Sequence, residues 1–264
     1  MSYISDFKGA TFSLFGVNGG QTSTDQNCET QTGQKFALAD GRTVALVQNG
    51  GTALTAGKLV QGPATIGANH TGLAVVGVAT ANPIGATSIT VTLGGTVTTA
   101  NQYQGGYAVV SAGTGIGQTL RIAANSAGTS SGSCVLTLED PLSVAITSVD
   151  SKVSLTLPQY GGQNGTNFST HGVVINPTTP TGRVLGVTLY PIPASTATVP
   201  YYGFIVTNGA VGCLNDASTT IGLGLMPSTN TPGAVMTYAT TGNYVGTSTV
   251  AGETTKAQMI TVML

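Results

Sequence analysis

The stretch GTGIGQTLRI at residues 113–122 carries three glycines at alternate positions, as a loop that cradles a phosphate can. A dinucleotide fingerprint needs a strand, a glycine turn and then a helix whose N-terminus faces the pyrophosphate. Here the residues after the glycines, Thr119 to Ala124, alternate as in a strand. The glycine spacing differs from the fingerprint, and the Gly-Lys-Ser/Thr of a P-loop is missing. We therefore predict a hairpin bend and not a nucleotide site.

The two histidines, His70 and His171, lie far apart in the sequence. His70 follows Asn69 in a polar bend, and His171 sits in NFSTHGVV. Either one could meet a serine in space, but the sequence has no nucleophile elbow. We interpret both as surface or loop histidines.

The carboxylates do not form a pair suited to acid/base catalysis. Glu139 and Asp140 are neighbours in an expected strand, so their side chains point to opposite faces. The other carboxylates considered stand alone, with no calcium-loop spacing: Asp25, Glu29, Asp216 and Glu253. We expect no catalytic residue, no cofactor, no metal ligand and no enzymatic activity.

The cysteines are odd in number and widely spaced: Cys28, Cys134 and Cys213. A zinc site needs closer spacing and further ligands, so free thiols in a reducing cytoplasm fit best. The N-terminal sequence lacks the charged start and apolar core of a signal peptide, and no apolar run approaches the ~20 residues that cross a bilayer. We expect no membrane association.

Charged residues make up 6% of the 264 residues, against about 25% in an ordinary globular protein. The eight Lys and Arg residues are scattered singly, which argues against nucleic-acid binding. A formal net charge of −1 gives little repulsion between copies. We therefore expect a chain that lives packed in an assembly; a neutral soluble protein is the alternative.

Strand-forming residues dominate, and clean two-residue periodicity marks half-buried antiparallel strands. The stretch SITVTL puts Ile89, Val91 and Leu93 on one face of a strand. The stretches CVLTLED and KVSLTL likewise put their apolar residues on one face. Asn49-Gly50-Gly51 and Asn208-Gly209 read as turns between strands. One or two helical turns are expected around Ala234 to Thr240.

Residues 1 to about 35 differ from the rest of the chain: the stretch GVNGGQTSTDQNCETQTGQ is polar, and apolar residues that could anchor it precede it, namely Tyr3, Ile4, Phe7, Phe12, Leu14 and Phe15. Such a segment buries too little to order by itself. It is either an arm that docks in a groove on another subunit or a loose tail. Overall we predict an all-β protein, an antiparallel sandwich or barrel-like core, with three parts: an extended arm over 1–40, a core from 41–81 plus 165–264, and an inserted β domain over 82–164.

The order of the segments resembles that of head decoration (cement) proteins of tailed bacteriophages. The stretch GGTALTAGKLVQ resembles the opening strand of that family, and RVLGVTLYPIPASTATVPYYGFIVTNGAVGCL its sequel. NYVGTSTVAGETTKAQMITVML resembles the closing strand pair, and GTGIGQTLRI followed by LTLEDPL resembles a unit of many phage structural proteins. The likeness spans roughly residues 40–264. The inserted domain is a departure, because many small decoration proteins lack it.

The resemblance implies a trimeric protein on the outer surface of a virion capsid, made in the host bacterial cytoplasm. It would sit at threefold or quasi-threefold axes, bind the major capsid protein and clamp adjacent subunits. Alternatives are another virion component, such as a head fibre or tail protein, a carbohydrate-binding adhesin, or a capsid-borne depolymerase. The missing tryptophan and export signal argue against the adhesin, and the scattered carboxylates against the depolymerase.

Overall fold

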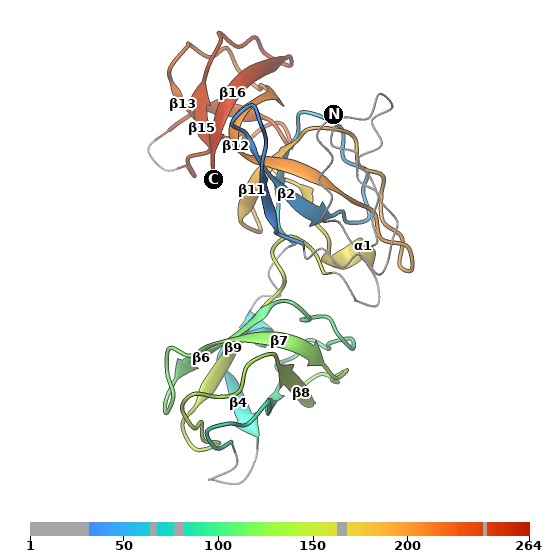
Figure 1. The fold of residues 1–264 in the computed structure, drawn as a ribbon, viewed down its shortest axis with the longest axis vertical. Coiled ribbons are helices and arrows are strands. Elements are labelled where there is room, and N and C mark those ends of the chain that lie inside the picture. Colours follow the sequence, from blue (N-terminus) through green and yellow to red (C-terminus); the bar gives the residue numbers. More distant parts are fainter. Residues whose placement is uncertain (1–31, 64–67, 77–81, 163–167, 240–241) are drawn as a thin grey trace. The chain divides into compact units, whose positions relative to one another are not determined.

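The computed structural model describes residues 32–63, 68–76, 82–162, 168–239 and 242–264. The fold is all-β, as predicted, and the ladders between its named strands are antiparallel in this part of the chain. The chain forms two compact units. The sheet unit takes its described residues from 32–63, 159–161 and 168–264, and the barrel unit from 68–158 and 162 (Figure 1).

The sheet unit is built on ten strands. They are β1 (Lys35–Ala37), β2 (Thr43–Gln48), β3 (Leu59–Gln61), β10 (Val174–Ile175), β11 (Val184–Thr188), β12 (Tyr202–Leu214), β13 (Gly224–Pro227), β14 (Val235–Thr237), β15 (Gly246–Ser248) and β16 (Ala257–Met263). The order is β10-β3-β11-β12-β16-β15-β13-β14, and β2 joins β1 to β12. A single helical turn, α1, spans Phe168–His171.

Two apolar clusters lie on opposite sides of β2. Val44 and Leu46 belong to one cluster, while Ala45 and Val47 belong to the other. Strand neighbours point to opposite faces of a sheet, and both faces of this strand are apolar. The whole strand is consequently buried beyond its first residue, as a central strand covered on both sides is.

Strand β12 is the longest element, and it changes partners along its length. Its first half pairs with β2 and its second half with β16. The change occurs beside Gly209, whose φ is +102°. The predicted turn at Asn208-Gly209 is therefore wrong: both residues lie inside β12, just after the register with β2 shifts between Val206 and Asn208.

The turn predicted at Asn49-Gly50-Gly51 is also wrong. Strand β2 does not pair with β3, and neither Gly50 nor Gly51 has a positive φ. Instead Gly50 N–H donates to Val173 O at 2.9 Å, and Gly51 N–H donates to Ser169 O at 2.8 Å. These glycines permit close approach of two backbones, which a sequence cannot distinguish from a turn.

The helix expected around Ala234 to Thr240 is replaced by β14, which pairs with β13. Sheet pairing at this edge overrides a weak local helix preference. Within the expected arm, residues 1–31 lie outside the described residues, whereas Lys35–Ala37 form β1 and pair with β2.

The barrel unit is a closed six-stranded barrel in the order β4-β5-β8-β7-β6-β9. Its strands are β4 (Leu73–Val76), β5 (Ser88–Thr92), β6 (Tyr107–Ala112), β7 (Thr119–Asn125), β8 (Ser133–Leu138) and β9 (Lys152–Thr156), and a 3₁₀ turn, η1, spans Ala68–His70. Strand β4, expected in the core, pairs with β5 and β9. The barrel thus begins before residue 82, because it cannot close without β4.

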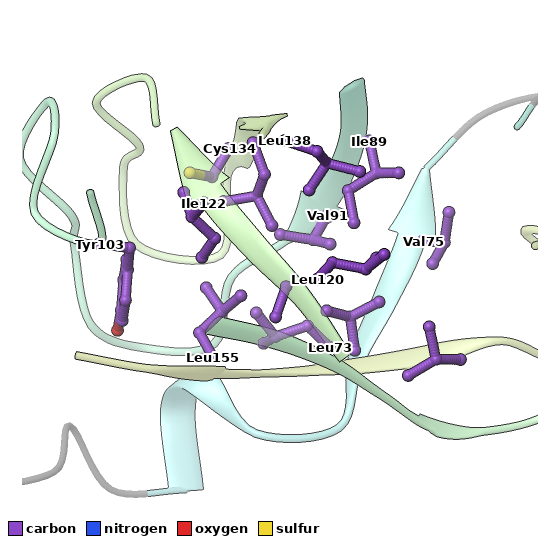
Figure 2. Close-up of a cluster of buried hydrophobic side chains, with 14 of the residues drawn as sticks. Leu73, Val75, Ile89, Val91, Tyr103, Leu120, Ile122, Cys134, Leu138 and Leu155 are labelled. Carbon is purple, nitrogen blue, oxygen red and sulfur yellow. The ribbon is translucent and has the colours of Figure 1, made fainter. Parts of the chain in front are cut away.

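The predicted two-residue periodicity is confirmed inside the barrel. Figure 2 shows side chains from several strands gathered into one apolar cluster, among them Ile89 and Val91 of β5 and Cys134 and Leu138 of β8. Each fully buried aliphatic side chain of this kind contributes about 1.5–3 kcal/mol to folding. Because a closed barrel has no edge strands, its remaining surface consists of outward strand positions and loops.

Candidate interaction surfaces

The glycine-rich stretch is the hairpin that the sequence predicts. Strands β6 and β7 pair on either side of it, with Ala108 opposite Leu120. Gly113, Gly115 and Gly117 have φ of +76°, +82° and +91°, so each adopts a conformation that other residues rarely take. The alternate glycines therefore shape a compact loop between two strands.

Three loops meet at one end of the barrel: residues 82–87, 113–118 and 139–151. Gly85 N–H donates to Leu142 O at 2.9 Å, and Asn82 and Ile146 form a β-bridge. The chain enters β4 at Leu73 and leaves β9 at Thr156, both at the opposite end of the barrel. We call the end formed by these three loops the barrel tip.

Side-chain hydrogen bonds hold the loops of the barrel tip together. Gln118 donates to Val144 O at 3.0 Å, and its Oε1 accepts from the backbone N–H of Ser143 and Val144 at 3.1 and 3.0 Å. Asp150 accepts from the backbone N–H and the hydroxyl of Thr114 at 3.0 and 2.9 Å. Hydrogen bonds from Thr147 and Thr114 lower the pKa of Asp150, so the carboxylate that ties these loops stays ionised.

The barrel tip displays aliphatic side chains to solvent. Ile84, Ile116, Val144 and Val149 come from its three loops and are between 47% and 77% exposed. Exposed aliphatic residues that occur singly are ordinary, whereas four on loops bonded to one another make this end of the barrel a candidate interaction surface. Sequence analysis missed these residues, because an apolar residue in a loop has no periodic pattern that separates exposure from burial.

The sheet unit has an exposed sheet face with no charge at its central positions. A row of neighbouring residues crosses four strands and ends just after a fifth, β14: Ala210, Thr261, Thr247, Gly224 and Tyr238, whose N–H donates to Gly224 O. Paired residues of antiparallel strands share a side of the sheet. The same side carries Met259 and Met263 of β16, whereas the intervening Ile260 and Val262 are fully buried on the other side. We call this exposed side the open face.

Two tyrosines lie over Gly224 on the open face. Tyr238 and Tyr244 pack edge to face, with ring centroids 5.9 Å apart and an interplanar angle of 73°. A Cβ at Gly224 would lie 3.1 Å from Tyr244 Cε2 and 3.3 Å from Tyr238 Cβ, so the glycine makes room for the pair. Along β16, Met259 and Met263 alternate with the buried Gln258, Ile260 and Val262, but the sequence alone does not show which side of a strand stays uncovered.

His70, interpreted as a surface or loop histidine, does not lie on the surface; it ends the short turn η1. His70 is 1% exposed; its Nδ1 contacts the Tyr103 hydroxyl, and its Nε2 lies 2.9 Å from Thr96 O. Burial raises the pKa of Tyr103, so this phenol stays neutral. His70 thus links η1 to the loop after β5. His171, at the end of α1, is partly exposed.

The remaining reactive groups are dispersed. Glu139 forms an ion pair with Arg121 at 3.2 Å, and Asp216 binds the 228–231 loop. Cys134 and Cys213 are buried free thiols, and burial raises the pKa of Cys213 to about 12; Cys28 lies outside the described residues. Over the described ranges, no group of three or more His, Cys, Asp or Glu residues could hold a metal ion, and no helix is long and apolar enough to cross a membrane.

Comparisons with known proteins give no match: no family model, no curated protein and no solved structure is similar to this chain.

Proposed function

We propose that this chain is a structural protein of a tailed-phage virion. It binds the outer surface of an assembled capsid as a homo-oligomer and stabilises the capsid by clamping adjacent major capsid subunits. The order of the sequence segments supports this assignment, as does an all-β fold with few charged residues. The observation that carries it is the barrel tip, where exposed aliphatic side chains are held on loops fixed by hydrogen bonds.

A fixed tip suits adhesion for a thermodynamic reason. Ordering loops on binding reduces affinity, and here Gln118 and Asp150 already hold the loops together. Burying Ile116 and Val149 against a capsid subunit would remove apolar surface from water. Because neither side chain is charged, this burial carries no cost of desolvating a charge on them. Because the protein binds the assembled lattice and not its free subunits, binding stabilises the lattice by linkage.

The test adds the purified full-length protein to undecorated heads of the virus that encodes it. We expect saturable binding, seen by co-sedimentation and electron microscopy, and a higher temperature of capsid rupture. An Ile116→Ser/Val149→Ser variant should need at least about tenfold more protein for half-occupancy, equivalent to a loss of about 1.4 kcal/mol.

The matched control is Ile221→Ser, which changes an isoleucine of similar exposure in the sheet unit. This variant should bind heads like the unchanged protein. Equal binding by the double variant would reject the barrel tip as the docking surface. Failure of the unchanged protein to bind heads, or to delay their rupture, would reject the function itself.

A further inference from the structure

The open face has the composition of a protein interface. Its large side chains, Tyr238, Tyr244, Met259 and Met263, are each between 42% and 50% exposed. Tyrosine and methionine are enriched at the centres of interfaces, and charged residues are depleted there. The central row between these side chains consists of Ala, Thr and Gly. The face therefore combines a few large side chains with a row of small, uncharged ones.

The face is held in shape before any partner arrives. The buried side of the same strands packs Val211, Ile260, Val262 and Leu225 into the core, each at most 3% exposed. The tyrosine pair is packed edge to face over Gly224. Rigid aromatic anchors lose little side-chain entropy on binding, so such a face requires little reorganisation to dock.

The charges point to a second copy of this chain as the occupant. None of the residues named for the open face is charged, so a charged partner surface would be desolvated there without compensation. The nearest charges in sequence to β16, Glu253 and Lys256, form an ion pair with each other. The chain itself is 6% charged with a net charge of −1, so another copy brings an equally neutral surface.

We propose that the open face is a self-association surface, covered in solution by another copy of this chain. Most homo-oligomers are symmetric: in a twofold dimer the same patch of each copy meets, whereas a ring joins two different patches of each copy. The inference deepens the self-association part of the proposed function and does not rest on capsid binding. A chain that binds heads as a monomer would overturn this inference and the homo-oligomer part of the proposed function, but not capsid binding itself.

The experiment measures the oligomeric state of the full-length protein by sedimentation velocity over a concentration series. We expect the unchanged chain to sediment well above its monomer mass of 26.3 kDa. Thr261→Glu puts a charge at the centre of the open face and should raise the dissociation constant at least about tenfold. Thr137→Glu, at an exposed position on β8 of the barrel unit, is the matched control and should leave the constant unchanged.

A second measurement uses the unchanged protein, so it does not depend on whether a variant folds. Peroxide should oxidise Met259 and Met263 several-fold more slowly in the oligomer than in the diluted monomer, as read by peptide mass spectrometry. The proposal would be overturned if the unchanged chain stayed monomeric at high concentration. It would also be overturned if both glutamate variants self-associated as tightly as the unchanged chain does. Equal oxidation rates of these methionines in oligomer and monomer would overturn it as well.

Discussion

At the scale of single residues, polar side chains of this protein fix loops. Gln118 ties two loops of the barrel tip, His70 links η1 to the loop after β5, and Asp216 fastens the turn at 228–231. In each case a side chain replaces the water that loop backbone and hydroxyl groups would otherwise bind. Asp216 lies where hydrogen-bond donors from Ser228, Asn230 and Thr231 converge.

Asp216 offers a test of this role through pH. Hydrogen bonds from the Ser228, Thr231 and Asn230 side chains hold the pKa of Asp216 below its usual range. A lowered folded-state pKa contributes stability that is present above the unfolded value of about 3.9 and is lost as pH falls through the folded value. At about pH 7 we expect Asp216→Asn to lower the free energy of unfolding by about 1–2 kcal/mol.

Urea unfolding at about pH 7 and about pH 3 checks this expectation. The difference between the variant and the unchanged protein should shrink at the lower pH, because below about pH 3.9 the unfolded Asp216 binds a proton whereas the folded carboxylate, with its lowered pKa, still resists protonation. A difference that is the same at both pH values would show that the carboxylate charge contributes nothing to the loop.

At the scale of elements, Gly209 lies where the partner of β12 changes. Gly209 has φ +102°, and a Cβ there would lie 3.0 Å from both Cα and Cγ of Arg42. Gly209→Ala should therefore lower the free energy of unfolding by about 1–3 kcal/mol, through backbone strain and the crowding of Arg42.

Gly212 is a matched control in the same strand. It has no positive φ, and a Cβ would meet nothing within 4 Å. Gly212→Ala should leave stability unchanged or raise it by up to about 1 kcal/mol. Equal destabilisation by the two substitutions, measured by chemical denaturation, would mean that β12 is sensitive to any side chain and not to the positive φ at Gly209.

At the scale of the whole molecule, the low charge predicts how association responds to salt. With charged residues at 6% and a net charge of −1, few ion pairs can form across any interface. We expect the dissociation constant for heads, and for self-association, to change less than about threefold between 50 and 500 mM NaCl. Titration of binding at the two concentrations measures this, and a steep loss at the higher one would point to an electrostatic interface.

The sequence by itself determined the fold class and most strands. The alternation in SITVTL, CVLTLED and KVSLTL places the same apolar residues inward that the barrel buries. This succeeds because an exposed polar face and a buried apolar face leave a two-residue period that local sequence records. The hairpin at residues 113–118 could be predicted for the same reason, since strand periodicity continues on both sides of its glycines.

Tertiary structure decided which strands pair with each other, and hence where both candidate surfaces lie. Glycines at 50, 51 and 209 look alike in sequence, yet the first two allow backbones to approach, whereas the third lies inside a strand with a positive φ. The expected helix near Ala234 became an edge strand, and β4 joined the barrel to close it. Exposure of Ile116 or Met259 likewise depends on which strands and loops lie beside it. Pairing between segments distant in sequence is a property of the whole fold, so no local pattern could specify it.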